Sequence, residues 1–303
     1  MKIIKKYFYL IILFIFIAIT TLSTEIYLNY VGLGDPVRYD SNYMYGYAPK
    51  INQIKKRFKD SRVTINEVGL RSLEKWNQNK QKILFIGDSI TYGGSYIDDK
   101  KLFTYLVCEE LSVFVCGNAG VNAYSIVNMV HRSKYDLRIK NSDIVIFLVS
   151  PGDFYREYKD KNTAHFYLNN KEFFLPAIQE AVSFFATKYD LNRYISKSDD
   201  SEAKNLYDLI NFSIKILDNE IERLKKNKKV LVFYTIEKND PYSNNVLNKY
   251  IYQSIKNKFK NKIINLSSTL NNSKYFHDSV HYTEDGHHAV SKKIISSLRL
   301  AIN

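Results

Sequence analysis

Two segments that lie far apart in the chain carry the residue types of a nucleophilic catalytic site. In the first, KILFIGDSITYGG, an apolar strand from Ile83 to Ile86 breaks at a glycine and brings Asp88 and Ser89 to its carboxyl end. In the second, FHDSVHYTEDGHHAV, Asp278 precedes His281 by three positions. A carboxylate at this spacing can hold the imidazole in one tautomer, so that its free Nε2 accepts the proton of a serine hydroxyl.

The chain around these residues alternates between apolar runs and helix-like stretches. Continuous apolar runs are typical of strands buried on both faces, and their alternation with helices predicts an α/β fold with a doubly wound parallel sheet. Ligands bind such sheets at the carboxyl ends of the strands, which is where Ser89 lies. The predicted strands begin at Ile83, Val113, Asp143, Val230 and Lys262, and the predicted helices cover Leu102–Leu111, Tyr124–Ile139, Pro241–Phe259 and Glu284–Leu300.

The segments after the first two predicted strands offer hydrogen-bond donors for a developing oxyanion. Ser89 starts a predicted helix, so its amide points outward, although Asp88 or Ser89 alternatively does no more than cap this helix. In CGNAGVNAYS the bare backbone of Gly120 can approach a substrate oxygen, and Asn118 or Asn122 can donate from its side chain. A simple tight turn is the alternative for this segment.

A metal site is the alternative interpretation of the histidine segment, which holds four of the six histidines of the chain. His and Asp are ordinary zinc ligands. The run DSVHYTED and Gly286 after it, however, predict a loop rather than one helical face that carries ligands. We therefore expect no metal at His277, Asp278, His281, Asp285, His287 or His288.

In order, spacing and strand context, the motifs resemble the SGNH/GDSL hydrolase family over about Lys82–Leu300. FIGDSIT resembles its first block, the glycine of NAG its second, and DSVH its last. The resemblance implies that Ser89 is nucleophile and oxyanion donor, that Gly120 is a second donor, and that Asp278 and His281 complete the triad. It also implies a three-layer α/β/α, flavodoxin-like fold with a five-stranded sheet, no metal or organic cofactor, and ester or acyl-transfer chemistry.

One position departs from the family pattern. The third block of the family ends a strand with G-x-N-D, whereas here DIVIFLV is followed by SPGD, so that Asp153 fits but Gly152 replaces the asparagine. Loss of one oxyanion donor costs about 10²–10³ in rate, which predicts a slower site or one repaired by Asn122. The aromatic residues that follow either form a wall facing a sugar or pack in the core. The predicted substrate-binding residues are Asp88, Asp153, Phe154 and Tyr155.

The amino terminus predicts a membrane segment. Three lysines precede an apolar run from Tyr7 to Leu22, and no acidic residue occurs before Glu25. This pattern fits a transmembrane anchor or a secretory signal, and the poor cleavage site favours the anchor. The positive-inside rule then leaves the lysines in the cytoplasm and the remaining chain outside the membrane, whereas a cleaved leader gives a secreted protein.

We expect four parts along the chain: a basic cytoplasmic tail (1–6), the anchor or signal (7–28), a Tyr-rich extended linker that packs on the main domain (29–80) and the hydrolase-like domain (81–303). The linker includes a short strand, Val63–Ile65. Segment 156–228 is too long for one crossover, and we interpret it as a helical insertion that partly roofs the site. It contains an aromatic amphipathic stretch, Phe173–Tyr189, and a charged helix, Ala203–Lys226.

Charge and cysteine content exclude some functions. The formal charge of +13 is basic, but lysines are spread along the chain and Asn, Ile and Tyr are abundant as well, so we expect no nucleic-acid partner. Cys108 and Cys116 are predicted to be two separate buried thiols, although an extracytoplasmic domain also permits a disulfide.

The leading hypothesis is a membrane-anchored serine esterase that removes O-acyl groups, above all O-acetyl, from a cell-envelope or exported polysaccharide or a small ester. Acyl transfer to a glycan by the same triad is the close alternative. A non-catalytic envelope module that binds a glycan or a protein partner is the alternative from another class. The anchor and its Tyr-rich linker resemble membrane-tethered members of the family found with envelope polysaccharide systems, which favours a glycan.

Overall fold

A five-stranded parallel sheet forms the centre of the protein in the computed structural model, which describes residues 2–158, 174–188, 201–238 and 246–302. The strand order is β6-β5-β7-β8-β9. This is the flavodoxin-like order, in which the first strand of the sheet lies between the second and the third. The prediction of a doubly wound five-stranded sheet is therefore confirmed. The strands are β5 (Gln81–Gly87), β6 (Phe114–Asn118), β7 (Ile144–Val149), β8 (Lys229–Tyr234) and β9 (Ile263–Asn265).

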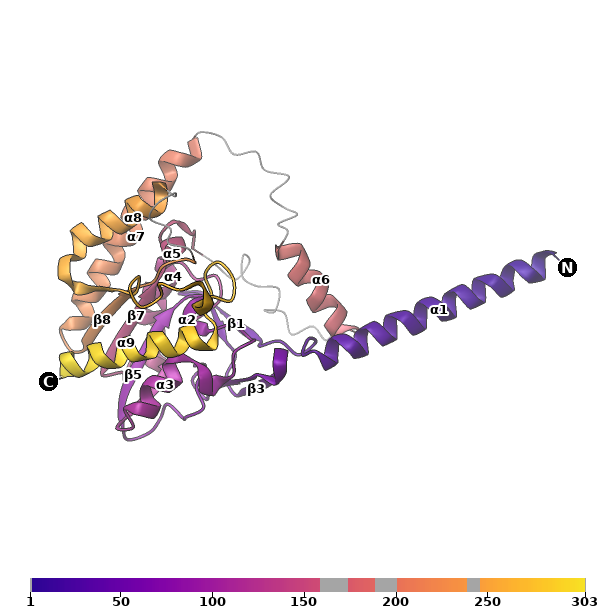
Figure 1. The fold of residues 1–303 in the computed structure, drawn as a ribbon, viewed down its shortest axis with the longest axis horizontal. Helices are drawn as coiled ribbons and strands as arrows, with labels where there is room; N and C mark the ends of the chain where they lie inside the picture. The colour runs from indigo at the N-terminus through magenta and orange to yellow at the C-terminus, as the bar shows by residue number, and fades with distance from the viewer. Residues whose placement is uncertain (1, 159–173, 189–200, 239–245, 303) are drawn as a thin grey trace.

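Helices cover both faces of this sheet (Figure 1). Successive residues of a strand point to opposite faces, so Ile83 and Phe85 pack with helices α3 and α9, whereas Leu84 and Ile86 pack with α4, α7 and α8. The three-layer prediction is confirmed by these two cores. The helices of the layers are α3 (Phe103–Glu110), α4 (Ile126–Tyr135), α7 (Ser201–Lys225), α8 (Val246–Phe259) and α9 (Glu284–Ile302).

Helix α7 does not lie over the site as we predicted for this segment. Its apolar residues, among them Ile214 and Leu217, are buried against the sheet, and the helix contacts α4, β8 and α8. It is thus the crossover helix between β7 and β8. Residues 159–173 and 189–200 of the predicted insertion, and the predicted start of the next helix at Pro241, lie outside the described residues.

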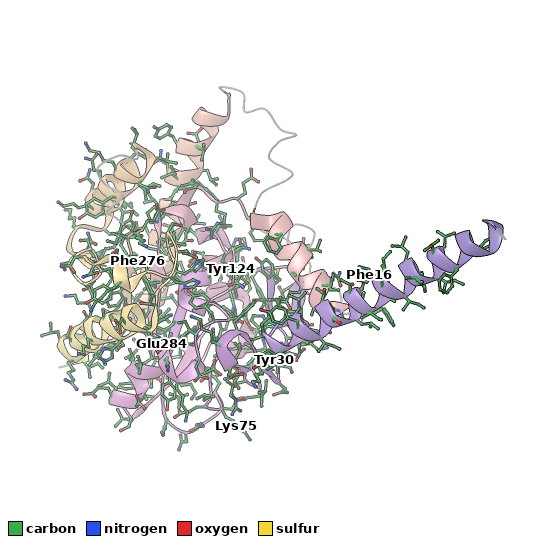
Figure 2. All side chains as sticks on the ribbon, turned by 45° about the vertical axis from the view of Figure 1, so that its right-hand side comes forward. Phe16, Tyr30, Lys75, Tyr124, Phe276 and Glu284 are labelled. Atoms are coloured by element: carbon green, nitrogen blue, oxygen red, sulfur yellow. A yellow bond between two sulfur atoms is a disulfide. The ribbon has the colours of Figure 1, made fainter. Side chains whose placement is uncertain are left out.

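Helix α1 (Lys2–Tyr30) extends away from the sheet and its layers (Figure 1). Its stretch Tyr7–Tyr30 is long and apolar enough to cross a membrane, and its large apolar side chains are mostly exposed, as Phe16 shows in Figure 2. The helix extends two residues beyond the predicted 7–28. Near its end, the carboxylate of Glu25 accepts the amides of Ala177 and Ile178, each at 2.9 Å. This contact places the start of helix α6 (Pro176–Lys188) beside α1.

Two antiparallel hairpins follow α1, namely β1 (Tyr39–Asn42) with β2 (Gly46–Pro49), and β3 (Gln53–Lys56) with β4 (Arg62–Ile65). Tyr39, Tyr47 and Trp76 of this region are buried in the core on the α4 face. Arg71 bridges the β4 end to the edge strand β6, since its amide donates to Asn118 O at 2.9 Å. The segment between α1 and β5 therefore packs on the main domain.

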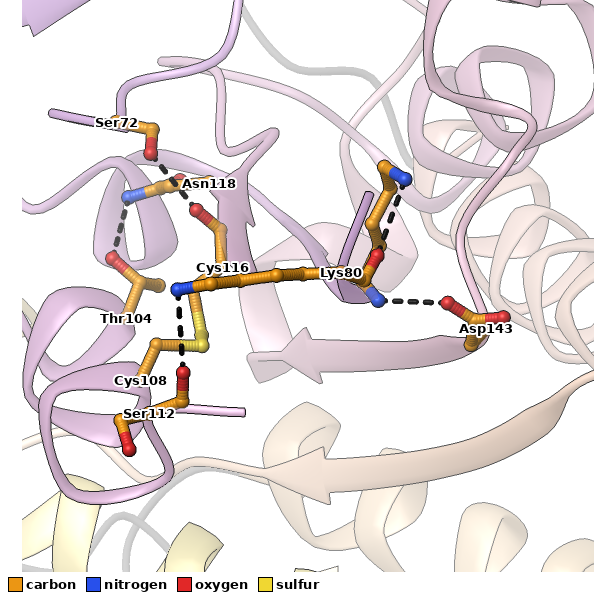
Figure 3. Close-up of a disulfide and its surroundings, with 9 residues drawn as sticks. Ser72, Lys80, Thr104, Cys108, Ser112, Cys116, Asn118 and Asp143 are labelled. Atoms are coloured by element: carbon orange, nitrogen blue, oxygen red, sulfur yellow. Dashed lines mark hydrogen bonds between the residues drawn. A yellow bond between two sulfur atoms is a disulfide. The ribbon is translucent and has the colours of Figure 1, made fainter. Parts of the chain in front are cut away.

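Cys108 of α3 and Cys116 of β6 form a disulfide, with their Cα atoms 5.7 Å apart (Figure 3). The prediction of two separate thiols was wrong. The connection between α3 and β6 is short, so β6 runs back beneath α3. This return brings the two cysteines side by side. The sequence shows two apolar neighbourhoods, but not that the two sulfur atoms face each other.

Candidate active site

Ser89 is the first residue of the short helix α2 (Ser89–Tyr92), directly after β5. Asp88 caps the helix, because its Oδ1 accepts the amide of Ile90 at 2.8 Å. Gly87 is required at this junction: a Cβ there would collide with Thr91 Oγ1 and approach Leu148 O to 2.7 Å. The strand can therefore turn into the helix only without a side chain at Gly87, and this turn presents Ser89 at the carboxyl edge of the sheet. The first amide of a helix has no partner within the helix, so the Ser89 N–H points outward.

The three residues predicted as a triad lie together. Nε2 of His281 is 2.8 Å from Oγ of Ser89, and Nδ1 of His281 is 2.7 Å from Oδ2 of Asp278. Oδ1 of Asp278 also accepts the amides of Val280 (2.9 Å) and His281 (2.8 Å). The carboxylate is thus fixed by its own loop, and it in turn fixes the imidazole. The arrangement allows His281 to take the serine proton while Asp278 stabilises the imidazolium.

The loop that carries His281 is held by backbone and ring contacts. The amide of His277 donates to the carbonyl of His281 at 2.7 Å, and the amide of Lys238 donates to Ser279 O at 2.7 Å. The Tyr96 ring stacks on His277, with ring centroids 4.1 Å apart, and its hydroxyl donates to Tyr282 O at 3.1 Å. Because Tyr96 follows α2, these contacts join the serine side of the site to the histidine side.

The surroundings of His281 and Asp278 set opposite pKa shifts. Burial of Asp278 favours its neutral form, but the hydrogen bonds from the His281 ring and from the amides of His281 and Val280 outweigh burial and hold its pKa below the usual range. Burial of His281 favours the neutral imidazole, but the hydrogen bond and charge of Asp278 outweigh burial and raise the pKa of His281. The neutral imidazole of His281 is therefore a stronger base at Nε2 than an unperturbed histidine.

Gly120 packs against the serine helix. A Cβ at Gly120 would collide with Tyr92 N and lie 2.7 Å from Thr91 C, so only glycine allows this approach. Its amide, predicted to hold an oxyanion, donates instead to Asn118 Oδ1 at 2.8 Å. Asn118 in turn donates from Nδ2 to Thr91 O at 2.7 Å. The same Nδ2 donates to Thr104 Oγ1 at 3.4 Å (Figure 3). In this conformation Asn118 positions α2 and occupies the Gly120 amide.

Asn122, the predicted replacement donor, is also engaged. Its Nδ2 donates to the Tyr39 hydroxyl at 3.4 Å, and its carbonyl accepts the Tyr47 hydroxyl at 2.6 Å. Both tyrosines belong to the β1–β2 hairpin, so Asn122 ties the loop after β6 to this hairpin.

A buried acidic pair with one arginine adjoins the serine. Asp153 is completely buried on helix α5 (Pro151–Tyr155), and its Oδ2 accepts the amide of Ser150 at 2.8 Å. Nη1 of Arg156 lies 3.2 Å from Asp153 Oδ1 and 3.6 Å from Asp88 Oδ2. Burial, followed by the charge of Asp88, raises the pKa of Asp153 well above its usual range. Asp88 and Asp153, predicted to bind substrate, are thus buried partners of Arg156.

Arg156 is the residue of this site that we did not predict. One signal for it exists in the sequence, because an arginine three positions after Asp153 on a helix can reach that carboxylate. Of the two aromatic residues predicted as a sugar-facing wall, Phe154 is completely buried in the core, so it cannot face a substrate. Tyr155 is partly buried and packs against the same core.

The remaining histidines of the segment serve other contacts. His287 is buried on α9 and stacks on Phe103, with ring centroids 5.5 Å apart, and burial lowers its pKa to about 3. The neighbouring His288 is exposed. Among the described residues, no group of three or more His, Cys, Asp or Glu side chains is arranged to hold a metal ion.

No protein-family model and no curated protein matches the sequence. Solved structures of similar fold include a member of the lipolytic protein G-D-S-L family from Veillonella parvula DSM 2008, at 15% identity over 71% of this chain and 97% of that one, with a TM-score of 0.43. They also include an acetyl xylan esterase at 18% identity (71% and 98% covered, TM-score 0.45). A third is an acetylxylan esterase from Geobacillus stearothermophilus at 13% identity (71% and 93% covered, TM-score 0.44). Similarities this low leave the reaction to be inferred from the residues of this chain.

Proposed function

We propose that this protein is a serine esterase that uses Ser89, His281 and Asp278 as its catalytic triad. The observation that carries the proposal is the continuous chain of contacts from Ser89 Oγ through both ring nitrogens of His281 to Asp278. Nucleophile and base within hydrogen-bond reach, with the base oriented by a third group, is the arrangement of covalent acyl catalysis.

In the first half-reaction, Ser89 Oγ attacks the ester carbonyl carbon while its proton moves to Nε2 of His281. The carbonyl π electrons move to oxygen and form a tetrahedral oxyanion, for which the Ser89 amide is a donor. Collapse of this intermediate breaks the bond to the alcohol, which leaves with the proton from His281. In the second half-reaction, water attacks the acyl group on Ser89 through the same steps, which releases a carboxylic acid and free Ser89.

The substrate class we propose is an O-acyl ester, above all an O-acetyl group, on a polysaccharide outside the cytoplasm. The side chains of His281 and Asp278 remain 27% and 48% exposed, which suits an acyl group presented on a large polymer rather than a buried small ligand. Acyl transfer is the same chemistry with a sugar hydroxyl in place of water. Product analysis with and without an added sugar acceptor separates the two outcomes.

We place the catalytic domain outside the membrane, with α1 as its anchor. The candidate span Tyr7–Tyr30 follows basic residues that favour the cytoplasmic side. The Cys108–Cys116 disulfide supports this location, because disulfides persist in oxidising compartments and are rare in the cytosol.

The experiment is covalent labelling of the full chain in detergent with a fluorophosphonate, together with hydrolysis of acetylated model esters. We expect the wild type to be labelled, Ser89→Ala to lose both labelling and hydrolysis, and Ser41→Ala, a change at an exposed serine on β1, to keep both. A wild type that is labelled no more than Ser89→Ala would overturn the proposal.

A further inference from the structure

The site needs a donor for the oxyanion beyond the Ser89 amide, and the two predicted candidates are occupied. The Gly120 amide is bonded to Asn118 Oδ1 at 2.8 Å, inside the packed contact with α2. Nδ2 of Asn122 is directed at the Tyr39 hydroxyl, 3.4 Å away. A single backbone amide leaves much of the developing charge without a partner, and each missing donor costs about 10²–10³ in rate.

Arg156 lies where the loops after three neighbouring strands meet. Its Nη1 is 2.5 Å from the carbonyl of Tyr124 in the loop after β6, 3.2 Å from Asp153 on the helix after β7, and 3.6 Å from Asp88 after β5. These contacts hold one edge of the guanidinium. Asp88 directly precedes Ser89, so the guanidinium contacts the residue that begins the serine turn.

The other edge of the guanidinium is unpaired within the described residues. Within the described part of the chain, Nη2 of Arg156 has no hydrogen-bond partner, and the side chain as a whole is 30% exposed. Nη2 lies 3.4 Å from the point that a Cβ of Gly152 would occupy. A Cβ at Gly152 would thus contact Nη2 at an ordinary van der Waals distance, whereas a longer side chain would compete with the guanidinium for this space.

The charge of Arg156 also reaches the base of the triad. Among the charges that act on His281, those of Asp278 and Asp88 favour the imidazolium, and that of Arg156 opposes it. The positive charge of Arg156 therefore acts on the imidazole, in addition to its contacts with Asp88 and Asp153.

We propose that Arg156 is the second oxyanion donor of this site, with Nη2 donating to the carbonyl oxygen of the ester as it becomes negative. Asp153, Asp88 and the Tyr124 carbonyl position the guanidinium, and Gly152 leaves it room. The inference rests on the proposed esterase function. A charged donor is favoured over a neutral one because hydrogen bonds between charged groups are about twice as strong, and the gain appears only when the oxygen carries charge.

The test is steady-state hydrolysis of a neutral acetate ester by the full chain in detergent. We expect Arg156→Ala to lower kcat by about 10²–10³ with little change in KM. Arg156→Lys keeps the positive charge but loses the two terminal nitrogens of the guanidinium, and we expect it to retain part of the wild-type kcat. Adding Gly152→Asn to Arg156→Ala places an amide donor in the vacated space, and we expect it to recover at least about tenfold in kcat.

The control is Arg223→Ala, since Arg223 pairs with an acid three positions earlier on α7 as Arg156 does with Asp153, but lies at the opposite edge of the sheet. We expect its kcat to equal that of the wild type. Fluorophosphonate labelling and thermal unfolding of each variant show whether the triad and the fold persist. If Arg156→Ala does not fold, the same kcat measurement is made on Arg156→Lys and Arg156→Gln. Both variants keep a side-chain donor toward Tyr124 O.

Three results overturn the inference: unchanged kcat in the Arg156 variants of an active wild type, a change in KM alone, or a loss of kcat that Gly152→Asn does not relieve. A change in KM alone would indicate that Arg156 binds substrate without stabilising the oxyanion. Failure of the esterase proposal itself is a different result, because the wild type would then show neither hydrolysis nor Ser89-dependent labelling.

Discussion

Oγ of Ser89 lies 2.8 Å from Nε2 of His281, although 192 residues separate the two in the chain. The parallel sheet explains this meeting, because every strand ends at the same edge and the loops that follow converge there. Ser89 comes directly after β5, and His281 precedes α9 in the loop after β9. Tyr96 and His277, whose rings stack, connect the two loops.

Single replacements in the triad should rank in a defined order. We expect Ser89→Ala and His281→Ala each to lower kcat by about 10⁶. Asp278→Asn should lower kcat by only about 10⁴, because it keeps the His281 base but no longer holds the imidazole in the reactive tautomer. The double variant Ser89→Ala/His281→Ala should be no slower than either single variant, since the two residues act in one step. Measured kcat values on an acetate ester check this ranking. Additive losses in the double variant would mean that the two residues act independently.

The pH dependence should follow the ionisation of His281. Its pKa is raised above the ordinary value of 6.5, and only the neutral imidazole accepts the serine proton. Activity should therefore rise with pH, with a midpoint above 6.5, and fall away as His281 becomes protonated. Asp278→Asn removes the charge that raises this pKa, so the midpoint should move to lower pH in the residual activity. Profiles of kcat/KM between about pH 5 and pH 9 measure both midpoints. A wild-type midpoint below that of Asp278→Asn would contradict the assignment.

The sheet was predictable because its strands carry a strong signal. Strands covered by helices on both faces are apolar throughout, and the runs at Ile83, Val113, Asp143, Val230 and Lys262 correspond to β5 to β9 with boundaries shifted by one or two residues. Helix α7 was misinterpreted for a related reason. Its charged outer face is visible in the sequence, but which layer its apolar face covers depends on tertiary packing.

The geometry of the site was predictable where residue type and spacing decide it, and not where side-chain orientation does. The positions of Ser89 and His281 follow from strand ends and loops. The occupied Gly120 amide, in contrast, depends on the side-chain direction of Asn118, which no local pattern reports. The same holds for Arg156, whose role depends on carbonyl and carboxylate oxygens of three separate loops.

Gly120 should not tolerate a side chain. In Gly120→Ala the new Cβ would meet the backbone of Thr91 and Tyr92, so α2 must shift and carry Ser89 with it. We expect a loss of about 1–3 kcal/mol in the free energy of unfolding, the usual cost of overpacking, together with weaker fluorophosphonate labelling. Gly152→Ala is the control for stability, because the nearest atom to its Cβ is a flexible arginine nitrogen at 3.4 Å. Equal stability of the two variants would show that α2 moves without cost.

The Cys108–Cys116 disulfide should stabilise the fold without taking part in catalysis. It closes a loop with a sequence separation of 8, for which loop-closure entropy gives about 2.5 kcal/mol. We therefore expect Cys108→Ala/Cys116→Ala to unfold at lower denaturant concentration, with the free energy of unfolding reduced by about that amount. The kcat of the folded variant should remain unchanged, because the disulfide joins α3 to the middle of β6, away from Ser89. Denaturant unfolding of the oxidised wild type, the reduced wild type and the double variant measures the effect. The reduced wild type should match the variant, and equal stability of all three would mean that the thiols are not joined in the native protein.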